Sequence, residues 1–107
     1  MEITLLHIEE CPNWEETGER LARALAATGH GDAPVDVVLL NAAEDAARYP
    51  FAGSPTILVD GADLFPGAET LPELACRVYR VGTRFAGAPS EEQLVDALRQ
   101  LPARAQS

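Results

Sequence analysis

The chain has 107 residues, 47% of them hydrophobic, and a formal net charge of −9. This length suits one domain with an apolar core, and the excess acid excludes a surface built to bind phosphate backbones or anionic lipids. No stretch of the sequence approaches the ~20 apolar residues needed to cross a bilayer, and the first eight residues lack the basic start of a secretory signal. We therefore expect a cytoplasmic protein with no nucleic-acid or membrane partner.

The first half of the chain alternates predicted strands and helices. Residues 2–8 are almost all apolar or β-branched, which is typical of a buried strand. An amphipathic helix is predicted from Trp14 and ends near Gly29. A second apolar strand is expected over 35–40, followed by a short helix over 42–49.

The next segment contains more turn signals. A third strand over 56–60 is entered through the turn Gly53-Ser54-Pro55. Residues 61–75 contain two glycines and two prolines, so we interpret this insertion as mostly loop with at most one helical turn. Residues 76–81 are a candidate fourth strand.

The last predicted helix begins at Ser90, where Gln93 completes a capping box. Pro102 is expected to end it and to leave 103–107 as a frayed tail. The element order is therefore β-α-β-α-β-β-α, an α/β pattern with a parallel pair, a crossover helix and an antiparallel hairpin capped by a helix. We expect one domain over residues 1–102.

Two motifs in this order resemble the thioredoxin-like superfamily. Cys11-Pro12-Asn13-Trp14 stands at the first strand-to-helix turn, where that family has its Cys-x-x-Cys redox turn. Residues 49–59, Tyr-Pro-Phe-Ala-Gly-Ser-Pro-Thr-Ile-Leu-Val, are similar to its second signature, a cis proline followed by a threonine that opens the third strand. The resemblance implies a three-layer α/β/α thioredoxin-like fold with a mixed four-stranded sheet. More narrowly, the chain resembles short bacterial thioredoxin-family proteins, some of them catalogued beside alkylmercury lyase.

The redox turn departs from the family pattern at its fourth position. Trp14 replaces the second cysteine, which a dithiol enzyme uses to resolve its mixed disulfide. The resemblance therefore predicts monothiol chemistry in which Cys11 is the nucleophile and forms mixed disulfides with protein thiols or glutathione, with glutathione as a possible co-substrate and no bound cofactor. A helix N-terminus favours the thiolate, while four nearby glutamates oppose it. The alternative is that Cys11 is a small, partly buried residue of an inherited turn.

The resemblance also implies a docking groove beside the reactive sulfur. A cis Pro55 would hold the backbone of Ser54 next to Cys11, where it could pair with an extended peptide or glutathione as an added strand. Thr56 begins the third strand at this point, and Trp14 would line the groove. The simpler alternative is an ordinary turn before a strand.

Cys76 is the other cysteine, and its distance from Cys11 cannot be derived from the sequence. It is either a buried strand residue or a resolving thiol that pairs with Cys11. A pair could also hold a soft metal or an organomercurial, since alkylmercury lyases use two cysteines and an aspartate, for which Asp60 and Asp63 are weak candidates. His7 ends the first strand, either near the site or as core packing, and the cysteines and histidines show no zinc-binding spacing.

Three functions follow from these residues. The first is a thioredoxin-like thiol protein, with thiol–disulfide oxidoreductase as its candidate enzyme activity. The second is a non-catalytic binding module on the same scaffold, with its acidic face and the insertion at 61–75 as contact surfaces. The third is soft-metal or organomercurial handling through Cys11 and Cys76. The sequence does not determine the oligomeric state.

Overall fold

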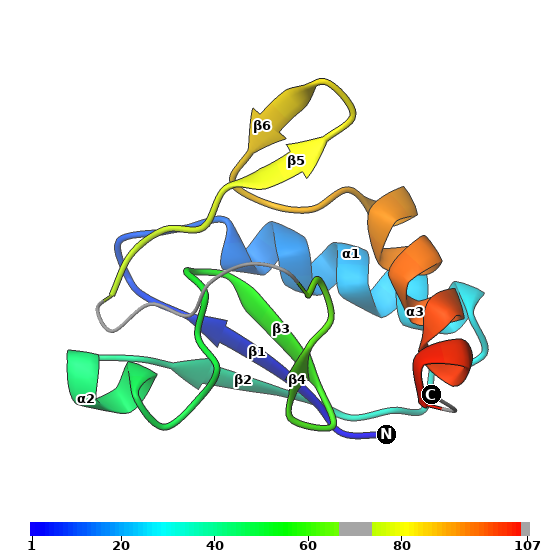
Figure 1. The fold of residues 1–107 in the computed structure, drawn as a ribbon, viewed down its shortest axis with the longest axis horizontal. Coiled ribbons are helices and arrows are strands. Elements are labelled where there is room, and N and C mark those ends of the chain that lie inside the picture. Colours follow the sequence, from blue (N-terminus) through cyan, green and yellow to red (C-terminus); the bar gives the residue numbers. More distant parts are fainter. Residues whose placement is uncertain (67–73, 106–107) are drawn as a thin grey trace.

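The computed structural model describes residues 1–66 and 74–105 and forms a sheet with helices on both faces (Figure 1). Four strands lie in the order β2-β1-β3-β4. The central strand β1 (Ile3–His7) is parallel to β2 (Val35–Leu39) and antiparallel to β3 (Thr56–Val59), whose other edge carries β4 (Ala62–Asp63). This mixed, thioredoxin-like α/β architecture confirms the expected fold class.

One face of the sheet is covered by α1 (Trp14–Ala27) and α3 (Glu91–Ala105). The amphipathic pattern of both helices explains this placement, because each buries its leucines against alternate residues of β1 and β3. The two helices are also tied together by an ion pair between Arg23 and Glu91. The core on this face contains Ile3, Leu5, Leu21, Leu25, Ile57, Val59, Leu94 and Leu98.

The opposite face carries a second, smaller apolar cluster beneath α2 (Ala43–Ala46). The start of this one-turn helix is held by Asp45, whose Oδ2 accepts hydrogen bonds from the backbone N–H groups of Asn41 (3.0 Å) and Ala42 (3.1 Å). The cluster contains Leu6, Ile8, Cys11, Leu40, Ala46, Phe51 and Leu58. One cysteine is therefore part of the core of this face.

Three predicted elements need correction. The fourth strand of the sheet is β4 at Ala62–Asp63, inside the segment predicted as loop, and it pairs with β3 just after a turn through Gly61 (φ +85°). The candidate strand over 76–81 is wrong as a member of this sheet, because its last residues pair elsewhere. Pro102 does not end α3, which runs to Ala105, since a proline removes one backbone donor without necessarily ending a helix.

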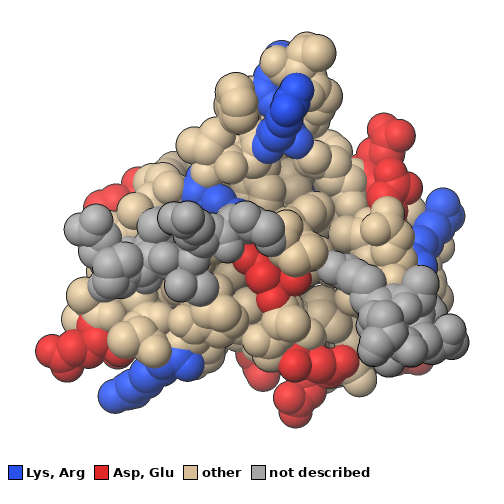
Figure 2. All heavy atoms as spheres, in the orientation of Figure 1, with Lys and Arg blue, Asp and Glu red and all other residues tan. Residues whose placement is uncertain are grey.

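A separate hairpin lies between β4 and α3. It consists of β5 (Tyr79–Val81) and β6 (Arg84–Ala86), and it projects from the body of the molecule in Figures 1 and 2. Part of the predicted insertion, 67–73, lies outside the described residues, as do 106–107. No helix in the described ranges is long and apolar enough to cross a membrane.

Candidate functional site

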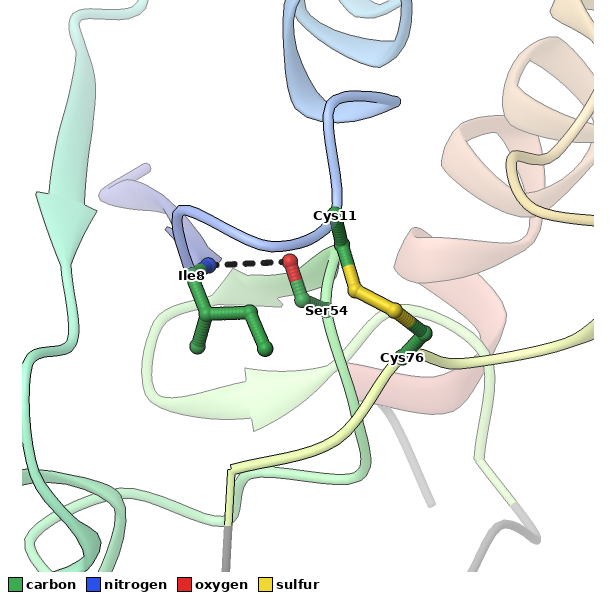
Figure 3. The surroundings of a disulfide bond; sticks show 4 residues. All are labelled: Ile8, Cys11, Ser54 and Cys76. Carbon is green, nitrogen blue, oxygen red and sulfur yellow. Dashed lines mark hydrogen bonds between the residues drawn. A yellow bond between two sulfur atoms is a disulfide. The ribbon is translucent and has the colours of Figure 1, made fainter.

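The two cysteines form a disulfide bond, with a Cα–Cα distance of 5.9 Å and a sequence separation of 65 residues. Figure 3 shows Cys11 in the loop that enters α1 and Cys76 in the segment that leads to β5. The interpretation of Cys76 as a buried strand cysteine is therefore wrong, because the residue is exposed and paired. The alternative, a pair with Cys11, agrees with the geometry.

Cys11 is buried, with 1% of its surface exposed. Its backbone N–H donates to the carbonyl of Ile8 at 3.4 Å, which closes the turn after β1. The N-cap of α1 is Asn13, without a side-chain capping bond, so Cys11 lies two residues before the cap. The electrostatic effect of a helix falls off within about one turn. The helix therefore stabilises a thiolate at Cys11 less than it would stabilise a thiolate at the N-cap position.

The loop before β3 lies directly beside this turn. The Ser54–Pro55 peptide bond is cis, as the resemblance predicted. The hydroxyl Oγ of Ser54 accepts a hydrogen bond from the backbone N–H of Ile8 at 3.0 Å (Figure 3). Thr56 stabilises the residues of the loop that precede Ser54, because its hydroxyl donates to the Gly53 carbonyl and accepts from the Ala52 N–H. The loop is thus fastened to the strand that leads to Cys11.

The backbone of Ser54 is occupied by the chain itself. Its N–H donates to the carbonyl of Ala75 at 2.8 Å, and its carbonyl accepts from the N–H of Arg77 at 2.9 Å. These two bonds form an isolated parallel β-bridge between Ser54 and Cys76. The backbone that was predicted to dock an external substrate is therefore paired with residues 75–77 of the same chain, centred on the cysteine that is bonded to Cys11.

Residues 75–79, here called the Cys76 segment, are anchored by side chains as well. The buried guanidinium of Arg77 pairs with Asp63 at 2.8 Å, donates to the Phe65 carbonyl at 3.0 Å and lies 4.6 Å from the ring centre of Tyr79. The Tyr79 hydroxyl donates to the carbonyl of Pro55, and burial raises the pKa of this phenol. The segment is therefore held at the site by contacts that do not depend on the disulfide.

Gly53 allows the Cys76 segment to approach this closely. Its φ of +108° is a conformation that favours glycine, and a Cβ placed there would lie 2.7 Å from the Cβ of Arg77. The sequence alone did not point to Gly53, Arg77 or Tyr79 as parts of the site, and Asp63 was only a weak candidate for mercury chemistry. Gly53, two residues before Pro55, belonged to a recognisable turn signal in the sequence. The roles of Asp63, Arg77 and Tyr79 depend on contacts between distant parts of the chain, which the sequence does not reveal.

Trp14 and His7 form a stacked pair below the turn. Their ring centres are 4.2 Å apart at an interplanar angle of 22°. His7 is 7% exposed, and among the described residues its Nδ1 has no hydrogen-bond partner. Burial lowers the pKa of this imidazole. His7 is thus a packing residue beside the turn, while the predicted contact of Trp14 with a substrate stays a prediction.

The aspartates considered for mercury chemistry have other partners. Asp60 accepts from the backbone N–H of Glu2 at 2.8 Å, and Asp63 pairs with Arg77. Within residues 1–66 and 74–105, no group of three or more potential ligand side chains could hold a metal ion. Soft-metal binding by the two sulfurs alone stays a prediction. No family model, curated protein or solved structure matches the chain, so the geometry of the site carries the functional argument.

Proposed function

We propose that this protein is a thioredoxin-like thiol–disulfide exchange protein in which Cys11 and Cys76 alternate between a disulfide and a pair of thiols. The observation that carries the proposal is the placement of the Cys76 segment, which pairs with Ser54 and brings a second sulfur to Cys11. The pair replaces the missing second cysteine of the turn, so the expected monothiol chemistry becomes dithiol chemistry.

The reaction is a two-electron exchange with an external thiol or disulfide. Two external thiols reduce the protein disulfide and leave as their own disulfide, while Cys11 and Cys76 gain the two electrons and two protons. In the reverse direction, an external disulfide oxidises the pair. Because Arg77 and Tyr79 hold the Cys76 segment independently of the sulfurs, the two thiols remain close after reduction, which favours rapid closure of the bond.

The test is a cycle of reduction and oxidation followed by mass measurement. The reduced protein, treated with glutathione disulfide and then with an alkylating agent, should return to a form that lacks two hydrogens and takes up no label. Cys11→Ser and Cys76→Ser are matched controls, and each should keep one thiol that ends as a mixed disulfide or an alkylated cysteine. A protein whose disulfide resists a large excess of thiol, or whose thiols do not close again, would contradict the proposal.

A second candidate function, a non-catalytic binding module, is favoured by the projecting hairpin. Phe85 in β6 is 74% exposed, and Val78, the residue before β5, is 65% exposed, so the hairpin and the residue that leads to it present two large apolar side chains to solvent. Residues 74–90 contain no acidic residue, although the chain as a whole is acidic, and two of their three arginines, Arg80 and Arg84, are exposed. This combination fits a protein partner with an apolar pocket and an acidic rim. If both serine variants still bound such a partner as wild type does, the binding-module function would be preferred.

A further inference from the structure

We infer that Cys76, and not Cys11, is the sulfur that external thiols attack, and that Cys11 acts only on Cys76. This inference rests on the proposed function and assigns the order of events within it. The two cysteines differ in burial. Cys11 is 1% exposed and belongs to the apolar cluster beneath α2, whereas Cys76 is an exposed residue. A thiolate must reach the sulfur that it attacks, so accessibility selects Cys76.

The local backbone supports the same assignment. Along the extended Cys76 segment, exposed and buried residues alternate, with Cys76 and Val78 outside and Arg77 and Tyr79 inside. The buried pair anchors the segment and leaves Cys76 on its outer side. The Cys11 turn instead keeps its cysteine buried, and the hydrogen bond from the Ile8 N–H to the Ser54 hydroxyl fastens this turn to the loop before β3. Exposing Cys11 therefore requires local opening, and exposing Cys76 does not.

The charges near the two cysteines favour the approach of an anionic thiol to Cys76. Two exposed glutamates, Glu9 and Glu10, directly precede Cys11, and they repel a negatively charged nucleophile. Residues 74–90 carry no acidic side chain, and their two exposed arginines, Arg80 and Arg84, add positive charge, whereas Arg77 is paired with Asp63. Glutathione, which is anionic at neutral pH, is thus a suitable probe of the exposed sulfur.

Reduction of the protein disulfide takes place in two exchange steps. The glutathione thiolate attacks Sγ of Cys76, a glutathione–Cys76 bond forms, the Cys11–Cys76 bond breaks, and its electron pair leaves on Sγ of Cys11 as a thiolate. A second glutathione thiolate attacks the glutathione sulfur of the mixed disulfide, which releases glutathione disulfide and the Cys76 thiolate. Oxidation follows the reverse path, in which the Cys11 thiolate attacks the mixed disulfide at Cys76. Cys11 is then an internal nucleophile.

The test traps the first intermediate in the wild-type protein. Oxidised protein is mixed briefly with glutathione, quenched with acid and an alkylating agent, and digested with trypsin, which separates the two cysteines because arginines lie between them. We expect glutathione on Cys76 and the alkyl label on Cys11. Glutathione on Cys11 would overturn this inference and leave the proposed function intact. A disulfide that glutathione does not reduce at all would overturn the proposed function itself.

The serine variants give an independent readout. The single thiol of Cys11→Ser should react with a disulfide reagent at least about tenfold faster than that of Cys76→Ser, since the buried sulfur reacts only during local opening. Denaturant should abolish the difference, and far-ultraviolet circular dichroism checks that both variants fold. Equal rates in two folded variants would contradict the assignment, whereas trapping in the wild-type protein needs no variant.

Discussion

At the scale of single residues, the stacked pair under the turn links stability to pH. His7 is buried against Trp14, and its Nδ1 has no hydrogen-bond partner among the described residues. Burial disfavours the charged imidazole and lowers its pKa below the ordinary 6.5. The folded protein therefore holds His7 neutral in a pH range in which the unfolded chain already binds a proton.

This difference predicts that His7 destabilises the fold in mild acid. Well above pH 6.5 the imidazole is neutral in both states, and its contribution to stability is fully present. As the pH falls below that value, the unfolded state takes up the proton first, so the free energy of unfolding decreases until the folded pKa is passed. One unit of pKa difference corresponds to about 1.4 kcal/mol.

Urea unfolding of the oxidised protein at pH 7.5 and 5.5 measures this effect. The His7→Phe variant keeps an aromatic ring for Trp14 and removes the titrating group. It should lose less stability than wild type between the two pH values, because the carboxylates titrate in both proteins and cancel in the comparison. An equal loss in the two proteins would show that His7 contributes nothing.

At the scale of elements, the Cys76 segment behaves as an extra strand on the loop before β3. It has one backbone bridge, one buried ion pair and one tyrosine contact, and Gly53 provides the space for all three. Removal of either partner of the Arg77–Asp63 ion pair should destabilise the segment strongly, because it leaves an unpaired buried charge.

Gly53→Ala should therefore loosen the segment. A side chain at a positive φ costs on the order of 1–3 kcal/mol, and the added Cβ would also clash with the backbone of Arg77 at 2.8 Å. Gly29→Ala is the matched control, since Gly29 also has a positive φ but its Cβ would meet nothing within 4 Å. Both variants should lose stability, and only Gly53→Ala should slow reoxidation of the thiols. Equal reoxidation rates would mean that the close contact at Gly53 does not position Cys76.

The place of the Cys76 segment could not be predicted from the sequence, although several other elements could. The strands β1 and β3 are apparent as apolar runs, and the capping box of α3 is present as expected, with the Ser90 and Gln93 side chains each bonded to the other's backbone N–H. The cis proline followed from the resemblance. The two-residue strand β4 could not be predicted because it carries no periodic pattern, and the Cys11–Cys76 pair depends on contacts across 65 residues of chain.

At the scale of the whole molecule, the disulfide joins the first turn of the fold to a segment outside the four-stranded sheet. It closes a loop across a separation of 65 residues, and the loss of freedom in the unfolded chain should stabilise the fold by about 4 kcal/mol on the chain-entropy treatment. The main core does not depend on the bond, because the cluster beneath α1 and α3 is built almost entirely from the sheet and these two helices. The smaller cluster beneath α2 includes Cys11 itself.

Reduction should therefore weaken the fold without abolishing it. We expect the free energy of unfolding in denaturant to fall by about 4 kcal/mol when a reductant is added, with a single cooperative transition in both states. The double variant Cys11→Ser/Cys76→Ser should resemble the reduced protein and should not respond to the reductant. Identical unfolding curves for oxidised and reduced wild type would contradict this expectation.

A second thiol supplied from outside the turn also changes what the turn itself must contain. The position after Asn13 need not be a cysteine to complete the pair, so Trp14 can be a packing residue. Cys76 and its anchors Arg77 and Tyr79 lie within four consecutive residues. Replacing these four residues would therefore remove the second thiol together with both of its anchors, whereas building them into another chain would also require Gly53 and Asp63 at their places in the scaffold.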